Sequence, residues 1–98
     1  MRIFAVRHGQ TSWNAEGRVQ GRSDIPLNRE GRRQALETAG KLAGLDAAIG
    51  MVITSPLRRA RETAEIIAGH LGAGIEIHEE IVERDFGDYE VRLLIDLL

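Results

Sequence analysis

Short apolar runs alternate with helix-forming segments along this chain, and this alternation restricts the possible fold more than any other feature. Residues 3–6 and 51–54 are almost continuously apolar, which is typical of strands buried on both faces of a parallel sheet. Residues 75–78 are expected to form a third strand. Strands that alternate with helices predict an open, mostly parallel α/β sheet with right-handed crossovers.

Two amphipathic helices are expected between these strands. Asn28 is suited to cap the first helix, which is expected to end near Leu45. Ser55 is expected to cap the second helix, with Pro56 at its first position and Gly72 at its end. Apolar residues at helical spacing define the buried stripes, namely Ala35, Leu36, Ala39, Leu42 and Ala43 in the first helix and Leu57, Ala60, Ala64, Ile67 and Leu71 in the second.

The size and composition of the chain suit a single small soluble domain. Its 98 residues suffice for one core, and we treat residues 1–98 as a single domain. The absence of cysteine excludes disulfides and thiolate metal sites. No apolar run approaches the length of a membrane span, and no charged and then apolar leader precedes the first strand. We therefore expect a cytoplasmic protein that makes no use of a membrane.

Basic residues are unevenly distributed, and nearly all of them are arginine. Residues 1–61 hold eleven of the thirteen basic residues and five acidic ones, whereas residues 62–98 hold ten acidic residues. The planar guanidinium group suits bidentate binding of phosphate or carboxylate, although a codon-composition bias would also explain the excess. The arginines lack interleaved aromatic residues and the C-terminal third is acidic, so a nucleic-acid partner is not expected.

The residues that could carry chemistry stand where the expected strands end. Arg7 and His8 follow the first apolar run, and Arg58 lies in the first turn of the second expected helix. Ligands bind at the carboxyl ends of strands in such sheets, so these side chains should meet over one crevice. A neutral imidazole can attack a phosphoryl group, which guanidinium groups and a helix N-terminus can hold. Glu83 could supply the proton for the leaving oxygen.

Four sequence blocks carry a family resemblance. The blocks RHGQTSWN, QGRSDIPLNREGRRQA, TSPLRRARETAEII and VERDFGDYE occur in this order along the chain. Their order and spacing resemble those of the histidine phosphatase superfamily, the phosphoglycerate-mutase-like proteins, but only of the N-terminal half of that domain. The resemblance implies a truncated α/β fold of three layers, with helices on both faces of an open, mostly parallel sheet.

The resemblance also implies an activity that needs no metal ion or organic cofactor. It makes His8 the nucleophile that forms a phosphohistidine, and Glu83 the proton donor. It makes Arg7 and Arg58 phosphate ligands, whereas the neighbouring residues Arg59 and Arg61 are expected to lie on the surface. A small phosphorylated metabolite is the implied substrate.

The same resemblance suggests that Asn14, Gln20 and Gly21 border the phosphate or the substrate. Asn14 and Gln20 could instead brace the loop through side-chain hydrogen bonds to the backbone. The segment QGRSDIPLN looks more like the small bacterial phosphatases than the glycolytic mutases, which usually carry a Gly-Trp pair there. We therefore expect a phosphatase, with a phosphoglycerate mutase-type phosphomutase as the alternative.

The chain departs from the family pattern at its end. The second catalytic histidine of the family follows a later strand in a Ser-His-Gly type motif, and neither His70 nor His78 stands in such a motif. Activity is therefore expected to be weak or absent, and a non-catalytic phosphate-binding or oligomerising remnant is the further alternative. The final run VRLLIDLL is expected to form a short helix. It could cover the apolar edge of strand 3–6 or contact a partner, which would allow a homo-oligomer.

Overall fold

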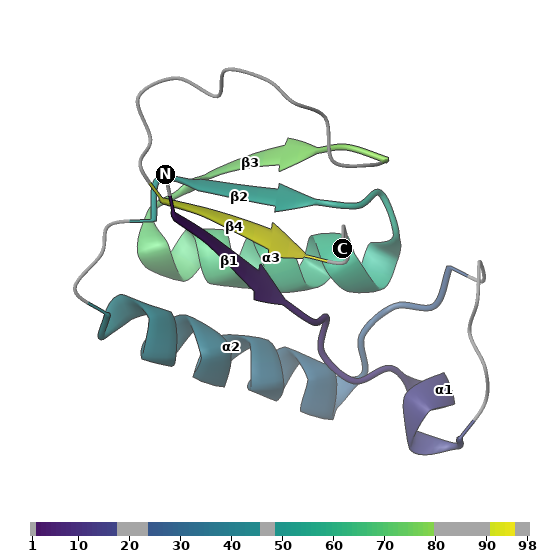
Figure 1. Cartoon of the computed structure of the whole chain (residues 1–98). Coiled ribbons are helices and arrows are strands. Elements are labelled where there is room, and N and C mark those ends of the chain that lie inside the picture. Colours follow the sequence, from purple (N-terminus) through teal and green to yellow (C-terminus); the bar gives the residue numbers. More distant parts are fainter. Residues whose placement is uncertain (1, 18–23, 46–48, 80–90, 96–98) are drawn as a thin grey trace.

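The computed structural model describes residues 2–17, 24–45, 49–79 and 91–95. In chain order the elements are β1 (Arg2–Val6), α1 (Ser12–Ala15), α2 (Arg29–Ala43), β2 (Met51–Thr54), α3 (Arg58–Leu71), β3 (Gly74–Ile77) and β4 (Val91–Ile95). The strands pair in the order β1-β4-β2-β3, all in parallel, so the predicted α/β fold with a parallel sheet is confirmed (Figure 1).

The long helices α2 and α3 lie on the same face of the sheet (Figure 1). The connections from β1 to β2 and from β2 to β3 cross the sheet in the same direction. Two right-handed crossovers in one direction put both helices on one side. We expected helices on both faces of the sheet. Among the described residues, α2 and α3 form the helical layer on one face. None of these helices is both long and apolar enough to cross a membrane.

The core lies between α3 and the central strands. Small residues on α3 allow the helix to approach the sheet closely, and this stripe is the one predicted from the sequence. On α2, Ala35, Ala39 and Leu42 are buried as predicted. The predicted stripe is wrong at its two other positions, because Leu36 is 55% exposed and Ala43 is exposed too. The residues with the least exposure in the core are Val52, Leu93 and Ile95 on the strands, Ala60, Ala64 and Ile67 on α3, and Ala39 on α2.

The C-terminal run is a strand and not the short helix that we expected. β4 occupies the gap between β1 and β2, with Phe4 opposite Leu93 and Val52 on its other side. Leu93 and Ile95 are completely buried there. The aliphatic side chains of this run bury more apolar surface between β1 and β2 than they would in an isolated helical turn. Packing in the sheet therefore overrides the local preference of the run for a helix. β4 thus covers one edge of β1. Of the two alternatives for this run, cover of that edge or contact with a partner, this is the first.

The helix caps agree with the sequence at one helix and differ at the other. Asn28 caps α2, because its Oδ1 accepts a hydrogen bond from the Gly31 amide at 2.7 Å. The prediction that Ser55 caps α3 is wrong: the N-cap is Leu57, which has no capping side chain. The Ser55 amide instead donates to the carbonyl of Ile95, which extends the pairing of β2 with β4 by one residue.

Candidate active site

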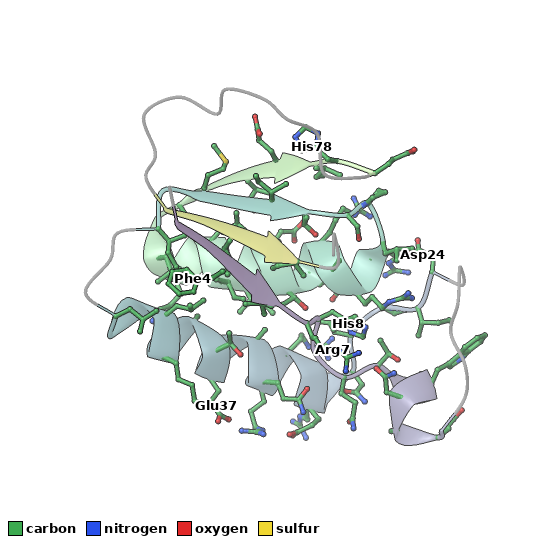
Figure 2. All side chains as sticks on the ribbon, in the orientation of Figure 1. Phe4, Arg7, His8, Asp24, Glu37 and His78 are labelled. Carbon is green, nitrogen blue, oxygen red and sulfur yellow. The ribbon has the colours of Figure 1, made fainter. Side chains whose placement is uncertain are left out.

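Arg7 and His8 lie directly beyond the carboxyl end of β1 (Figure 2). Nδ1 of the half-buried His8 lies 2.5 Å from the carbonyl oxygen of Gly9. A carbonyl oxygen can only accept a hydrogen bond, so Nδ1 carries the proton. In a neutral imidazole with its proton on Nδ1, the lone pair lies on Nε2, and this form of the ring can act as a nucleophile.

The segment 7–11, here called the site loop, is fixed to α3 through a buried hydrogen bond. The Gly9 amide donates to Oγ1 of Thr63 at 3.1 Å, and this hydroxyl donates to the carbonyl of Arg59 at 2.8 Å. Thr63 is only 1% exposed. This contact joins the loop after β1 to the first turns of α3. The sequence predicts such a meeting, because both segments follow the carboxyl ends of parallel strands.

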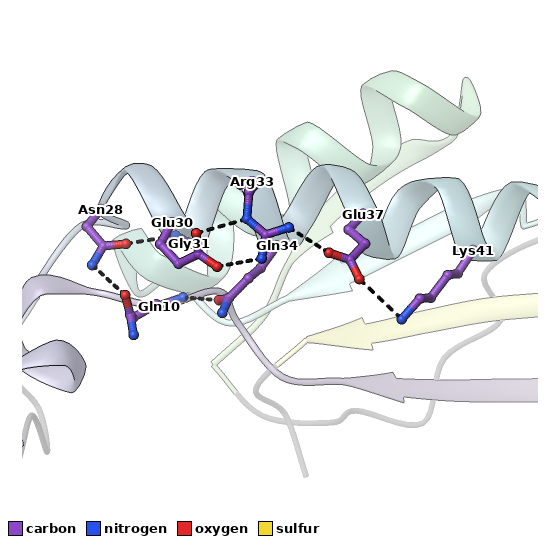
Figure 3. A network of polar contacts seen from close by, with 8 residues as sticks. All are labelled: Gln10, Asn28, Glu30, Gly31, Arg33, Gln34, Glu37 and Lys41. Atoms are coloured by element: carbon purple, nitrogen blue, oxygen red, sulfur yellow. Dashed lines mark hydrogen bonds and ion pairs between the residues drawn. The ribbon is translucent and has the colours of Figure 1, made fainter.

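The site loop is also fixed to the start of α2 (Figure 3). Gln10 accepts a hydrogen bond from the Asn28 amide at its carbonyl and another from the Asn28 side chain at its Oε1. The Gln10 amide donates to Oε1 of Gln34 at 2.8 Å. The backbones are so close that a Cβ atom on Gly9 or Gly31 would lie under 3.0 Å from backbone atoms of the other segment. Two helices therefore hold His8 in place.

The N-terminus of α3 is capped by a residue far away in the sequence. The Arg58 amide donates to Oδ1 of Asp24 at 2.7 Å, and a carboxylate is favourable at this positive end of a helix. Asp24 lies at the same end of the sheet as Arg7 and His8 (Figure 2). The Arg58 side chain itself is exposed to solvent. The described contacts involve the Arg58 backbone and leave the role of its guanidinium group a prediction.

Arg59 is the residue that the sequence interpretation missed. The expectation that it lies on the surface is wrong, because Arg59 is only 7% exposed. It stands one helical turn before Thr63, on the face of α3 that contacts the site loop. The spacing contains the signal: Arg59, Thr63 and Ile67 follow one another at intervals of four and share one helix face. Arg61 is partly buried, so it too departs from the expected surface position.

Asn14 takes part in local structure. Its Oδ1 accepts from the Thr11 amide at 3.0 Å, and the Asn14 amide lies 3.2 Å from Oγ1 of Thr11. These reciprocal bonds form a capping box at the start of α1. The bracing alternative is thus what the described contacts show, while contact with a substrate stays a prediction. Gln20, Gly21 and Glu83 lie outside the described residues.

The two other histidines lie on different elements. His70 is exposed in the last turn of α3, where positive charge suits the helix dipole. His78 follows β3, and its Nε2 lies 3.4 Å from Oε2 of Glu76. Among residues 2–17, 24–45, 49–79 and 91–95, no three His, Asp or Glu side chains gather in a way that could hold a metal ion.

The sequence model of the histidine phosphatase superfamily (branch 1) matches residues 3–96, and the chain belongs to this superfamily. The uncharacterized phosphatase PhoE of Bacillus subtilis is 47% identical over 88 residues, which are 90% of this chain and 45% of that protein. The probable phosphoglycerate mutase GpmB of Cronobacter sakazakii is 44% identical over 94 residues, which are 96% of this chain and 43% of that protein. The chain therefore spans less than half the length of these relatives.

Solved structures of the superfamily share the fold. A mycobacterial glucosyl-3-phosphoglycerate phosphatase, solved in complex with VO3, superposes with a TM-score of 0.73 at 33% identity. The match covers 90% of this chain and 41% of that one. The phosphoglycerate mutase-like fold expected from the four sequence blocks is confirmed by this likeness.

Proposed function

We propose that this chain transfers phosphate from a small phosphomonoester to His8 and then to water, as a phosphatase of the histidine phosphatase type. The single observation that supports this best is the hydrogen bond from Nδ1 of His8 to the carbonyl of Gly9. In the neutral ring this bond favours the tautomer with a lone pair on Nε2, and the two anchors of the site loop fix the backbone that carries the ring.

The phosphoryl group needs positive charge around its oxygens before a nucleophile can approach. Arg7 and Arg58 are proposed ligands for these oxygens, as the family resemblance implies. We add Arg59, because its guanidinium group is buried on the face of α3 that contacts the site loop. Glu83 is proposed as the proton donor, and Asn14, Gln20 and Gly21 as residues that border the substrate.

A phosphatase is preferred to a mutase because of the segment QGRSDIPLN, and the relatives carry names of both kinds. A mutase returns the phosphoryl group from the histidine to a second hydroxyl, whereas a phosphatase gives it to water. Release of inorganic phosphate from p-nitrophenyl phosphate and from 3-phosphoglycerate, measured together with the formation of 2-phosphoglycerate, separates the two. We expect slow release of phosphate without isomerisation.

Trapping of the intermediate tests the proposal directly. After incubation with p-nitrophenyl phosphate, an acid-labile and base-stable phosphoryl group is expected on His8 by mass spectrometry at high pH. His8→Ala should abolish the label, and the matched variant His70→Ala should keep it. Arg59→Met should reduce labelling more than Arg58→Met. Labelling that persists in His8→Ala, or no labelling of the folded wild type, would refute the proposal. Binding of phosphate without labelling would support the non-catalytic alternative.

A further inference from the structure

One peptide group of the site loop contacts both the imidazole of His8 and helix α2. This group joins Gly9 to Gln10, and its carbonyl oxygen, that of Gly9, lies 2.5 Å from Nδ1 of His8. Its N–H, the Gln10 amide, donates to Oε1 of Gln34 at 2.8 Å (Figure 3). Because a peptide group is planar and rigid, the contact that holds its N–H also sets the direction of its carbonyl. Gln34 is therefore linked to the ring of His8 through a single peptide group.

The other anchor of the site loop acts on a different peptide group. The Gly9 amide, which donates to Oγ1 of Thr63 at 3.1 Å, belongs to the group that joins His8 to Gly9. The two peptide groups are separated by the rotatable bonds of Gly9, and glycine restricts this rotation less than other residues do. The bond to Thr63 thus holds the loop on α3 without fixing the carbonyl that meets the imidazole.

Helix α2 presents Gln34 to this peptide group at close range. Gly31 lies one turn before Gln34, and its lack of a side chain lets the backbone of Gln10 approach the helix. Gln34 is half-buried, whereas its neighbour Arg33 is exposed. The Gln34 side chain supplies an acceptor that carries no charge. A carboxylate would accept more strongly, but its negative charge would oppose a phosphate group nearby.

We propose that Gln34 is a positioning residue that keeps the proton of the neutral His8 ring on Nδ1. Its Oε1 holds the plane of the peptide group, so that the carbonyl oxygen stays directed at Nδ1. The hydrogen bond at the N–H also polarises the peptide group and makes its carbonyl oxygen a better acceptor. The lone pair then stays on Nε2. The benefit for catalysis rests on the proposed function, in which His8 attacks a phosphoryl group, whereas the position of the proton does not depend on that function.

The nitrogen-15 chemical shifts of the ring nitrogens report the position of the proton and test the proposal. Spectra are recorded at a pH at which the ring is neutral, and the His8 signals are identified by their loss in His8→Ala. Gln34→Met has a similar length without the acceptor. It should lower the ratio of the Nδ1–H form to the Nε2–H form by roughly fivefold, the equivalent of one ordinary hydrogen bond. Gln34→Glu supplies a stronger acceptor and should raise this ratio above that of the wild type.

Thr63→Val is the matched control, because it also removes the acceptor of a site-loop amide. It should leave the ratio of the two forms at its wild-type value, whatever it costs in stability. An unchanged ratio in Gln34→Met with wild-type circular dichroism, or an equal loss in Thr63→Val, would overturn the proposal. If Gln34→Met does not fold, a ratio in Gln34→Glu at or below that of the wild type would overturn it as well.

Labelling of His8 separates this inference from the proposed function. Gln34→Met should also slow the labelling of His8 by p-nitrophenyl phosphate, because less of the ring has its lone pair on Nε2. If the ratio of the two ring forms changes as expected while the wild type is never labelled, the role of Gln34 is supported and the proposed function fails.

Discussion

Substitution of Gly31 by alanine is expected to destabilise the protein, although alanine is the better helix former. Gly31 lies in the first turn of α2, where an added Cβ would meet the backbone nitrogen of Gln10 at 2.8 Å and its carbonyl oxygen closer still. The site loop must therefore move away from α2. This movement breaks the two hydrogen bonds between Asn28 and Gln10 and the one from the Gln10 amide to Gln34.

The expected magnitude follows from these contacts. Each broken hydrogen bond costs about 1 kcal/mol, and the helix gains at most about 1 kcal/mol from replacing glycine. Gly31→Ala should therefore lower the free energy of unfolding by roughly 2 kcal/mol, a large share of the stability of a small domain. Gly40→Ala is the matched control on the same helix, because a Cβ there would contact nothing within 4 Å. It should raise stability by roughly 0.5–1 kcal/mol.

Urea denaturation followed by circular dichroism measures both changes. The two variants make the same chemical substitution in one helix, so opposite signs can only come from the contact with the site loop. If Gly31→Ala stabilised the protein as much as Gly40→Ala, the close approach of the loop to α2 would be refuted. The same variant should also weaken labelling of His8, since the site loop carries that residue.

Three further substitutions test single contacts. Thr63→Val removes the acceptor of a buried amide of the site loop and should cost about 1–3 kcal/mol in urea denaturation, whereas Thr63→Ser should be close to wild type. Asp24→Ala removes the distant cap of α3 and should cost about 0.5–2 kcal/mol, with Asp24→Asn intermediate. On the exposed face of α2, hydrogen bonds from Arg33 lower the pKa of Glu30 and of Glu37. Their stabilisation is present above the usual glutamate pKa of about 4.3 and is lost as pH falls through the lowered values, so the wild type should lose more stability on acidification than Arg33→Gln.

Features that depend on neighbouring residues in the sequence were predictable. The apolar runs identified β1 and β2, because strands of a parallel sheet are buried on both faces. The strand expected at residues 75–78 lies within one residue of β3. Asn28 could be assigned as a cap, since a cap and the amide that it binds lie within one turn. The position of His8 beyond β1 followed from the point at which the apolar run stops.

Features that depend on distant parts of the chain were not predictable. The cap of α3 comes from Asp24, 34 residues before the amide that it binds, so the local candidate Ser55 was preferred in error. The run that forms β4 has no fixed preference, and the gap between β1 and β2 makes it a strand. Arg59 was expected on the surface because charged residues are rarely buried, although its spacing with Thr63 indicates the buried face.

The central claim is that the site loop and the first turn of α3 form a single phosphate site. A titration of the isotopically labelled protein with inorganic phosphate, followed by amide resonances, tests it most directly. The amides of His8, Gly9, Arg59 and Ala60 should shift together with one dissociation constant, and those of the distant strand β3 should not move. Shifts confined to one of the two segments, or none at saturating phosphate, would contradict the account.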